Sequence, residues 1–189
     1  KKRVIQMGES PKNIFNVGAL GVENIKKIKL INKEKLEKKL SIKFNKYNFL
    51  ITINSFIEEK VSINDFLKNF FLAIKKFKDT SFIFTLPNSD LKSDYIRNKI
   101  LDFCKKNKNS YTFKSLGAQK YLSCMKICDV VLGNSSSGIL EAPTLKVATV
   151  NIGDRQKGRL QANSIINSDY SFKKIYISTT YMVKMKNKF

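Results

Sequence analysis

The sequence predicts an α/β protein built on a doubly wound parallel sheet, and three observations support this prediction. Short apolar runs alternate with longer amphipathic runs between residues 47 and 153, which is typical of βα units around a parallel sheet. The 189 residues suffice for one such domain with short additions. The apolar fraction of 42% is ordinary for a globular chain. We therefore expect one folded domain that needs no disulfide for its stability.

The predicted elements follow one another in βα order. The expected strands are residues 47–54, 80–86, 110–116, 129–133 and 147–153. The expected helices are residues 62–77, 93–107 and 118–128, with one more between the last two strands. Ser62 is the expected N-cap of the first of these helices. Pro143 lies in the last one and fits without a kink only in a first turn, so this helix either begins near Leu140 or bends.

The formal charge of +21 invites a nucleic-acid partner, but its distribution argues against one. The basic residues are spread along the whole chain, and only four of them are arginine, the side chain that reads guanine edges and binds phosphate with two bonds. Lysine, asparagine, isoleucine, phenylalanine and tyrosine all have codons rich in A and T, so a biased genome explains much of the charge. We therefore do not expect nucleic acid to be the main partner.

The cysteine content and the absence of sorting signals bear on location. Neither a signal peptide nor a membrane-spanning segment is visible in the sequence. Cys104, Cys124 and Cys128 are odd in number, and no histidine is present to complete a zinc site with them. Buried thiols in a reducing compartment explain them better. We expect a cytoplasmic protein with no membrane partner and no metal.

One stretch, from Gly133 to Arg159, carries most of the chemistry. Three serines follow the predicted strand 129–133, and ligands of open α/β sheets bind at such carboxyl ends, where helix N–H groups and hydroxyls suit phosphate. Glu141 would be repelled by phosphate unless it faced another group, and a ribose can donate two hydroxyls to one carboxylate. The stretch fits a nucleotide site, and it fits equally an ordinary serine turn with a solvated glutamate.

Several catalytic designs are excluded. The chain contains no histidine, so a Ser-His-Asp triad and imidazole acid–base catalysis are impossible. No Walker A motif and no G-x-G-x-x-G motif is present. The segment GALG at residues 18–21 follows only a weak strand and lacks a third glycine, so it is not a dinucleotide fingerprint.

Three motifs make the sequence resemble the hydrolysing UDP-N-acetylglucosamine 2-epimerases of the sialic-acid type. They are GNSSSGILEAP (133–143), VNIGDRQKGR (150–159) and NVGALGVENI (16–25). The resemblance runs from about Arg3 to Tyr170 and covers only the C-terminal half of the family's usual length. It implies a glycosyltransferase-B fold, in which two Rossmann-like domains face each other across a cleft and the C-terminal one holds UDP.

The resemblance also implies a reaction on a nucleotide-sugar in sialic-acid biosynthesis. UDP is eliminated from UDP-N-acetylglucosamine to leave a 2-acetamidoglucal, and water then adds to give N-acetylmannosamine, with no metal or redox cofactor. The implied contacts are Ser135 and Ser136 to the diphosphate, Glu141 to the ribose, Arg155 beside the nucleotide, Asn88 in a PN-x-D loop, and the backbone of Leu116 at the uracil. For Asn88 a plain Pro-Asn turn explains the residue almost as well.

Two departures from the family pattern limit what this chain is expected to do. Asn54 stands where the family has a histidine that acts on the phosphates and in catalysis, and an amide cannot shuttle a proton. The family's acid–base carboxylates belong to an N-terminal domain that the sequence does not include. We therefore expect binding of UDP or a UDP-sugar without turnover. A separate N-terminal domain or a second copy of the chain is the expected partner.

The resemblance further implies three segments. Residues 1–46 are expected to be a connector from the missing N-terminal domain, residues 47–170 the Rossmann-like nucleotide-binding domain, and residues 171–189 a divergent or truncated tail. Without its partner domain, the connector should expose apolar residues such as Val17 and Val22, and the chain should be prone to self-association.

Two other hypotheses stay open. A glycosyltransferase-B sugar transferase shares the serine turn and the glutamate, although the GDRQKGR segment argues against it. A non-catalytic basic domain would bind RNA or another anionic surface, and its binding would weaken steeply with salt.

Overall fold

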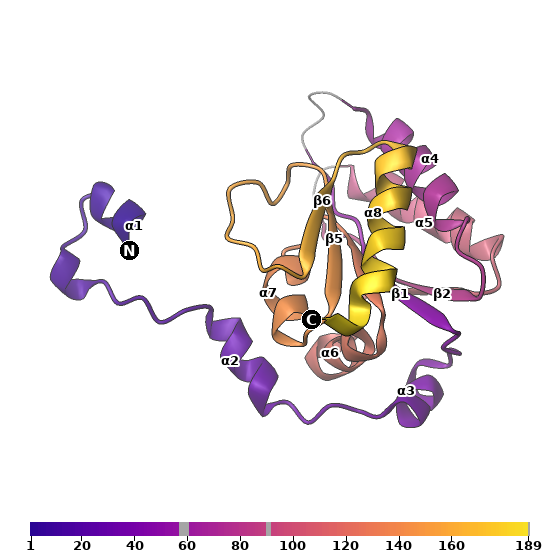
Figure 1. Cartoon of the computed structure of the whole chain (residues 1–189), viewed down its shortest axis with the longest axis horizontal. Helices are drawn as coiled ribbons and strands as arrows, with labels where there is room; N and C mark the ends of the chain where they lie inside the picture. Colours follow the sequence, from indigo (N-terminus) through magenta and orange to yellow (C-terminus); the bar gives the residue numbers. More distant parts are fainter. Residues whose placement is uncertain (57–60, 90–91, 189) are drawn as a thin grey trace.

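The chain folds around a single parallel sheet (Figure 1). The computed structural model describes residues 1–56, 61–89 and 92–188. Its six-stranded sheet has the order β3-β2-β1-β4-β5-β6, and all neighbouring strands are parallel. The order reverses between β1 and β4, so the predicted doubly wound α/β class is confirmed. The strands are β1 (Tyr47–Thr52), β2 (Thr80–Thr85), β3 (Ser110–Phe113), β4 (Val130–Gly133), β5 (Ala148–Ile152) and β6 (Ile165–Ser168).

Helices cover both faces of the sheet. One face carries α4 (Ile63–Ile74), α5 (Ser93–Lys105) and α8 (Phe172–Met185), and the other carries α3 (Lys33–Leu40), α6 (Gly117–Ile127) and α7 (Ser137–Thr144). Strand β1 shows the reason, because Phe49 and Ile51 belong to the first core cluster and Leu50 to the second. Side chains alternate between the faces of a strand, and both faces are buried here, so the strands are continuous apolar runs.

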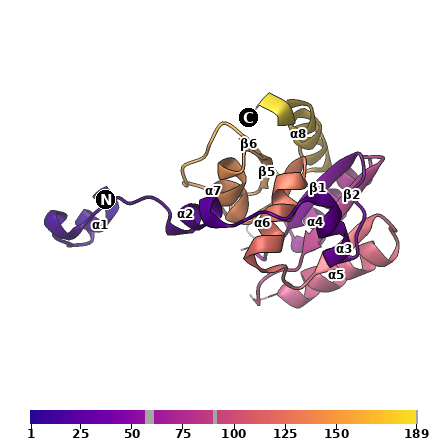
Figure 2. The ribbon, with the colours of Figure 1, turned by 90° about the horizontal axis from the view of Figure 1, so that it is seen from below.

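The N-terminal segment extends away from the sheet, as Figures 1 and 2 show. It contains α1 (Lys2–Gln6), the short 3₁₀ helix η1 (Pro11–Asn13) and α2 (Leu20–Lys27). Helix α1 buries no residue, and Met7, Phe15 and Val17 are 83%, 78% and 73% exposed. Helix α2 contacts the folded domain: it packs against α7, and its Ile25 is buried. Val17 is therefore exposed as expected, whereas Val22 is half-buried.

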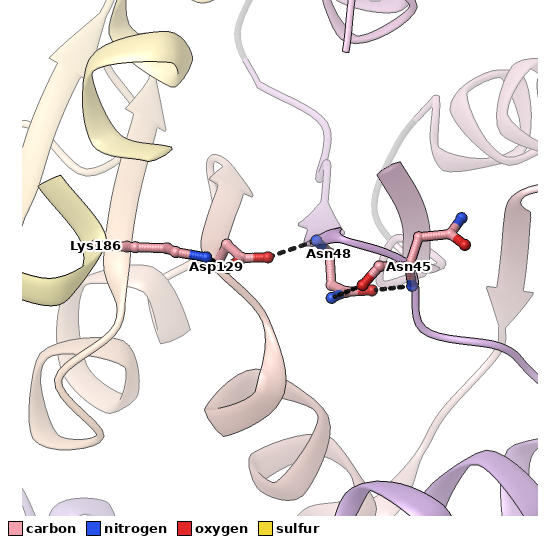
Figure 3. Close-up of polar contacts among 4 residues, drawn as sticks. All are labelled: Asn45, Asn48, Asp129 and Lys186. Carbon is pink, nitrogen blue, oxygen red and sulfur yellow. Dashed lines mark hydrogen bonds and ion pairs between the residues drawn. The ribbon is translucent and has the colours of Figure 1, made fainter. Parts of the chain in front are cut away.

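A closed polar cluster joins the amino ends of β1 and β4 (Figure 3). Asp129 accepts a hydrogen bond from the Asn48 N–H through Oδ2 at 2.7 Å and pairs through Oδ1 with Lys186. Asn45 donates its N–H to Asn48 Oδ1 at 2.9 Å, and Asn48 Nδ2 donates back to the Asn45 carbonyl at 3.0 Å. Lys186 directly follows α8, so the cluster also fixes the end of the last helix to the sheet.

Strand β6 and helix α8 are among the elements that were not predicted from the sequence. In α8 the buried positions are Ile175, Ser178, Thr179 and Met182. Their spacing is helical, but two of the four are polar, so a hydrophobic pattern does not reveal the helix. Strand β6 lies at the edge of the sheet and buries only Ser168 among its four residues. The tail from residue 172 to residue 185 is therefore a helix packed against α4 and β5.

Pro143 lies near the end of α7 and not in its first turn. Helix α7 begins at Ser137, so a late start near Leu140 is wrong. Pro143 is the penultimate residue of the helix, where its missing N–H costs only one hydrogen bond, the one that would reach the Ile139 carbonyl.

In the described part of the chain, no helix combines the length and apolar character needed to span a bilayer.

Candidate functional site

The carboxyl ends of the parallel strands meet at one edge of the sheet, and the loops there carry the residues identified from the sequence. These are Asn54 after β1, Asn88 after β2, Leu116 after β3, Ser135 and Ser136 after β4, and Arg155 after β5, with Glu141 following in α7. The edge includes the reversal point between β1 and β4, where open α/β sheets bind their ligands.

Gly133 allows the β4 loop to leave the sheet close to β1. Its φ is 127°, a region that favours glycine, and a Cβ at this position would lie 1.9 Å from the Thr52 carbonyl oxygen. The next residue, Asn134, donates its N–H to the same oxygen at 3.2 Å. The glycine is therefore required by the close approach of the backbone to β1.

The three serines form a tight turn that starts α7. Ser135 Oγ accepts the Ser137 N–H at 3.3 Å, and the Ser135 carbonyl accepts the Gly138 N–H at 3.2 Å. All three serines are half-buried at the start of an eight-residue helix. First-turn N–H groups and the positive end of the helix dipole favour an anion at such a position.

A partly buried network, which we call the Asn134 junction, links four of the loops. It comprises Asn54, Asn88, Asn134, Arg155 and Gln156. Asn134 Oδ1 accepts the Asn54 N–H at 2.7 Å, and Asn134 Nδ2 donates to the Asn54 carbonyl at 2.8 Å. Asn54 Oδ1 in turn accepts the Asn88 N–H at 3.2 Å. The ends of β1, β2 and β4 are thus held together by side-chain amides.

The loop after β5 joins the same junction from the other side. The Asn134 carbonyl accepts Gln156 Nε2 at 2.8 Å and Arg155 Nη1 at 3.4 Å. Gln156 is buried, whereas Arg155 is exposed, so its guanidinium lies beside the serine turn at the surface of the edge. Four of the residues named from the sequence, Asn54, Asn88, Arg155 and Ser135, therefore lie in or next to one connected structure.

Glu141 lies one turn into α7 and is half-buried. Its Oε2 has no hydrogen-bond partner among the described residues, and burial, the largest cause, raises the pKa of its carboxyl. Glu141 lines a cavity of about 210 Å³ together with Tyr121 and residues of α2, including Asn24 and Ile25. A buried carboxylate oxygen without a donor is costly, and a donor from a ligand would remove that cost.

Tyr121, in α6, connects this cavity with the serine turn. Its hydroxyl forms a short hydrogen bond with Ser137 Oγ. Burial raises the pKa of Tyr121, hydrogen bonds from Ser137 and Thr52 lower it, and the nearby Glu141 raises it further. The phenol therefore stays protonated at neutral pH and can act as a donor beside the turn.

Leu116 has a different role from the polar residues. Its side chain is buried in the core between the sheet and α6, and it immediately precedes that helix. A ligand at this loop would thus meet backbone atoms of Leu116 rather than its side chain. No hydrogen bond between described residues connects it to the Asn134 junction.

Three other features of the described residues bear on ligands or metals. A larger cavity of about 880 Å³ lies at the ends of β5 and β6 and is lined by Asn151, Gly153, Asn167 and Tyr170 among others. Within the described ranges, no group of three or more acidic, cysteine or histidine side chains is arranged to hold a metal ion. Cys124 and Cys128 are buried free thiols whose sulfurs lie 4.0 Å apart.

A family comparison decides the relationship that the motifs indicated. The model of the family described as UDP-N-acetylglucosamine 2-epimerase matches residues 1–189. The chain belongs to this family. The predicted resemblance is therefore confirmed, and so is the Rossmann-like domain of glycosyltransferase-B type.

Two curated relatives and one solved structure define this similarity. The polysialic acid biosynthesis protein P7 of Escherichia coli is 44% identical over 88% of this chain and 42% of its own. The GDP/UDP-N,N'-diacetylbacillosamine 2-epimerase (hydrolyzing) of Campylobacter jejuni is 41% identical over 89% of this chain and 44% of its own. The Methanocaldococcus jannaschii UDP-GlcNAc 2-epimerase, solved with UDP-GlcNAc and UDP, superposes with a TM-score of 0.71 at 20% identity, over 96% of this chain and 51% of that one. The chain thus spans less than half the length of the curated relatives it matches.

Three residues at this edge of the epimerase-family domain were not singled out from the sequence. Asn134 and Gln156 are buried amides in the motifs, but their neighbours Ser135 and Arg155 are the residues that the resemblance assigned to the ligand. The only available signal was their position inside the two motifs. Tyr121 gave no sequence signal, because a tyrosine in an amphipathic helix is usually a packing residue.

Proposed function

We propose that this chain is the UDP-binding half of a hydrolysing UDP-N-acetylglucosamine 2-epimerase. The observation that carries the proposal is the serine turn at the reversal point of the sheet, with Arg155 hydrogen-bonded beside it and Glu141 on the same helix. A turn of this kind offers N–H and hydroxyl donors to an anion, while the guanidinium adds positive charge. The names of the curated relatives support the hydrolysing class.

The three parts of UDP are matched by three kinds of group at this edge. Ser135, Ser136 and Arg155 would take the diphosphate, and the unpartnered Oε2 of Glu141 would accept hydrogen bonds from the ribose hydroxyls. The uracil would lie against the backbone at Leu116. Because the Oε2 of Glu141 is a buried atom without a donor among the described residues, two ribose hydroxyls would relieve the cost of its burial as they bind.

The proposed overall reaction converts UDP-N-acetylglucosamine and water into N-acetylmannosamine and UDP. The carboxyl-edge residues of this chain would bind and orient the leaving UDP, which is the role of a group that stabilises charge as the bond to the sugar breaks. No side chain at the Asn134 junction is a base that could take the C2 proton, because Asn54 and Asn134 are amides. We propose that residues 47–170 bind the nucleotide and that the chain alone is inactive.

The proposed partner is an N-terminal domain, contributed by the same polypeptide, a separate chain or a second copy of this one. The exposed apolar residues of the N-terminal segment, Met7, Phe15 and Val17, support such a partner. The names of two relatives refer to polysialic acid and to N,N'-diacetylbacillosamine, and these names support our proposal of a cytoplasmic enzyme of nucleotide-sugar biosynthesis.

Calorimetric titration with UDP, UMP and uridine at moderate salt tests this function. We expect UDP to bind with micromolar to millimolar affinity, to bind about tenfold or more tightly than uridine, and to bind more weakly to Glu141→Ala. Glu34→Ala, an exposed glutamate on α3, is the matched control and should bind as the wild type does. Absence of UDP binding, with tight and salt-sensitive binding of random RNA instead, would overturn the proposal.

A further inference from the structure

Gln156 carries a buried side-chain amide, although the proposed function gives this residue no role. It is 1% exposed, its Nε2 donates to the Asn134 carbonyl at 2.8 Å, and its Oε1 has no partner among the described residues. A buried amide with one unpaired oxygen stabilises a fold little, and an apolar side chain of similar shape would serve packing as well or better. The amide is therefore better explained by what its one hydrogen bond positions.

The hydrogen bond from Gln156 and the one from Arg155 share one acceptor. Both donors end on the carbonyl oxygen of Asn134, although the Arg155 contact is longer, at 3.4 Å. Because the two residues are adjacent in the loop, a fixed Gln156 side chain limits where the Arg155 backbone can go. A guanidinium pairs with phosphate through two parallel N–H bonds and needs a defined orientation to do so.

Asn134 is fixed in turn by β1. Its side-chain amide bonds both the N–H and the carbonyl of Asn54, at 2.7 and 2.8 Å, and its own N–H reaches the Thr52 carbonyl. Asn134 also immediately precedes Ser135, the first residue of the serine turn. One buried residue thus connects the sheet, the turn and the Arg155 loop.

We propose that Gln156 and Asn134 are positioning residues that set Arg155 and the serine turn at the spacing a nucleoside diphosphate requires. The inference rests on the proposed UDP binding and adds residues that do not themselves contact the ligand. Supporting shells of this kind hold binding groups to within a fraction of an ångström and contribute through the groups they orient. Loss of Gln156 should therefore weaken the grip on the diphosphate and leave the nucleoside part of the site intact.

A double-mutant cycle tests the inference by calorimetry. Gln156→Met keeps the length and burial of the side chain but cannot donate a hydrogen bond. We expect Gln156→Met and Arg155→Ala each to weaken UDP binding about five- to tenfold, and the double variant to be no more than about twofold weaker than Arg155→Ala alone. Uridine affinity should be unchanged in Gln156→Met. The control is Gln161→Met, in the same loop but exposed and hydrogen-bonded to Asn167, which should bind UDP as the wild type does.

The outcomes separate this inference from the proposed function. If the wild type binds UDP and the two substitutions add independently, or if Gln156→Met weakens uridine as much as UDP, the positioning role is wrong and UDP binding stands. If the wild type binds no UDP, the proposed function itself fails. A second variant, Asn134→Ser, covers the case in which Gln156→Met unfolds: it removes the side-chain amide that bonds Asn54 and adds no charge, and a selective loss of UDP over uridine is again expected.

Discussion

A carboxylate lies at each end of the parallel strands, Asp129 at the amino edge and Glu141 at the carboxyl edge, and the two differ in their hydrogen-bond partners. At the amino edge, both oxygens of Asp129 have partners, namely the Asn48 N–H and Lys186 (Figure 3). At the carboxyl edge, Glu141 is half-buried, and none of the described residues donates a hydrogen bond to its Oε2. The first arrangement is complete without a ligand, and the second is not.

This difference separates stability from binding within one small domain. Asp129 connects β1, β4 and the end of α8, so its interactions stabilise the fold. Glu141 keeps acceptor capacity at the edge where parallel sheets bind ligands. Substitutions at the amino edge should lower the free energy of unfolding without changing the affinity for UDP. Substitutions at Glu141 should weaken UDP binding without lowering the free energy of unfolding.

The largest expected effect concerns Gly133, which brings the carboxyl edge together. In Gly133→Ala the new Cβ would meet the Thr52 carbonyl oxygen at 1.9 Å, so β4 and β1 would have to separate. We expect a loss of more than about 4 kcal/mol in the free energy of unfolding, or failure to fold. Gly158→Ala is the control, because its φ is also positive at 78° but, apart from its chain neighbours, no atom of the described residues lies within 4 Å of the added Cβ, and it should cost about 1 kcal/mol. Urea unfolding measures both, and similar losses would refute the close-approach argument.

Asp129→Asn tests the amino edge. It removes the charge that pairs with Lys186 and weakens the bond to the Asn48 N–H, so we expect about 2 kcal/mol lower stability in urea unfolding. Calorimetry should give an unchanged affinity for UDP. Asp102→Asn, an exposed residue of α5, is the control and should be neutral within about 0.5 kcal/mol. A tenfold loss of UDP affinity in Asp129→Asn would contradict the separation of the two edges.

The pH dependence of UDP binding tests Glu141. Burial raises the pKa of its carboxyl, so the folded chain takes up a proton more readily than the unfolded chain, and stability should decline as the pH rises through that raised pKa. Ribose hydroxyls need the ionised form, so UDP affinity should fall as the pH falls through the same range, by up to about tenfold per pH unit. In Glu141→Gln both dependences should disappear, the affinity should be about tenfold lower, and the melting temperature near neutral pH should be no lower than that of the wild type.

The smallest effect is expected for Asn54→His, which introduces the histidine that the family resemblance implies at this position. Asn54 Oδ1 accepts the Asn88 N–H, and an imidazole nitrogen can accept the same bond. We expect UDP affinity within about threefold of the wild type at pH 8, and tighter binding than the wild type at the same pH below about pH 6.5, where the imidazole becomes charged beside the diphosphate. A ratio of the two affinities that does not change with pH would mean that residue 54 does not face the phosphates.

The sequence predicted the sheet better than its surroundings, for physical reasons that particular residues illustrate. The runs at Tyr47 and Thr80 are buried on both faces, so apolar continuity alone revealed β1 and β2. Helix α8 stayed hidden because Ser178 and Thr179 occupy half of its buried positions. The Asn134 junction could not be predicted either, since which amide meets which backbone group depends on the distance between loops that are distant in sequence.

Amide chemical shifts recorded during a UDP titration show where the ligand binds on the chain. We expect UDP to shift the N–H signals of Ser135, Ser136, Ser137 and Arg155 and to leave those of Asn48 and Asp129 at the opposite edge unmoved. The same pattern should disappear when Glu141→Gln is titrated at low UDP concentration. Shifts centred on Lys126, Lys146 and Lys186, which line a cavity of about 370 Å³ at the amino edge, would contradict it, because the ligand would then be following positive charge rather than the serine turn.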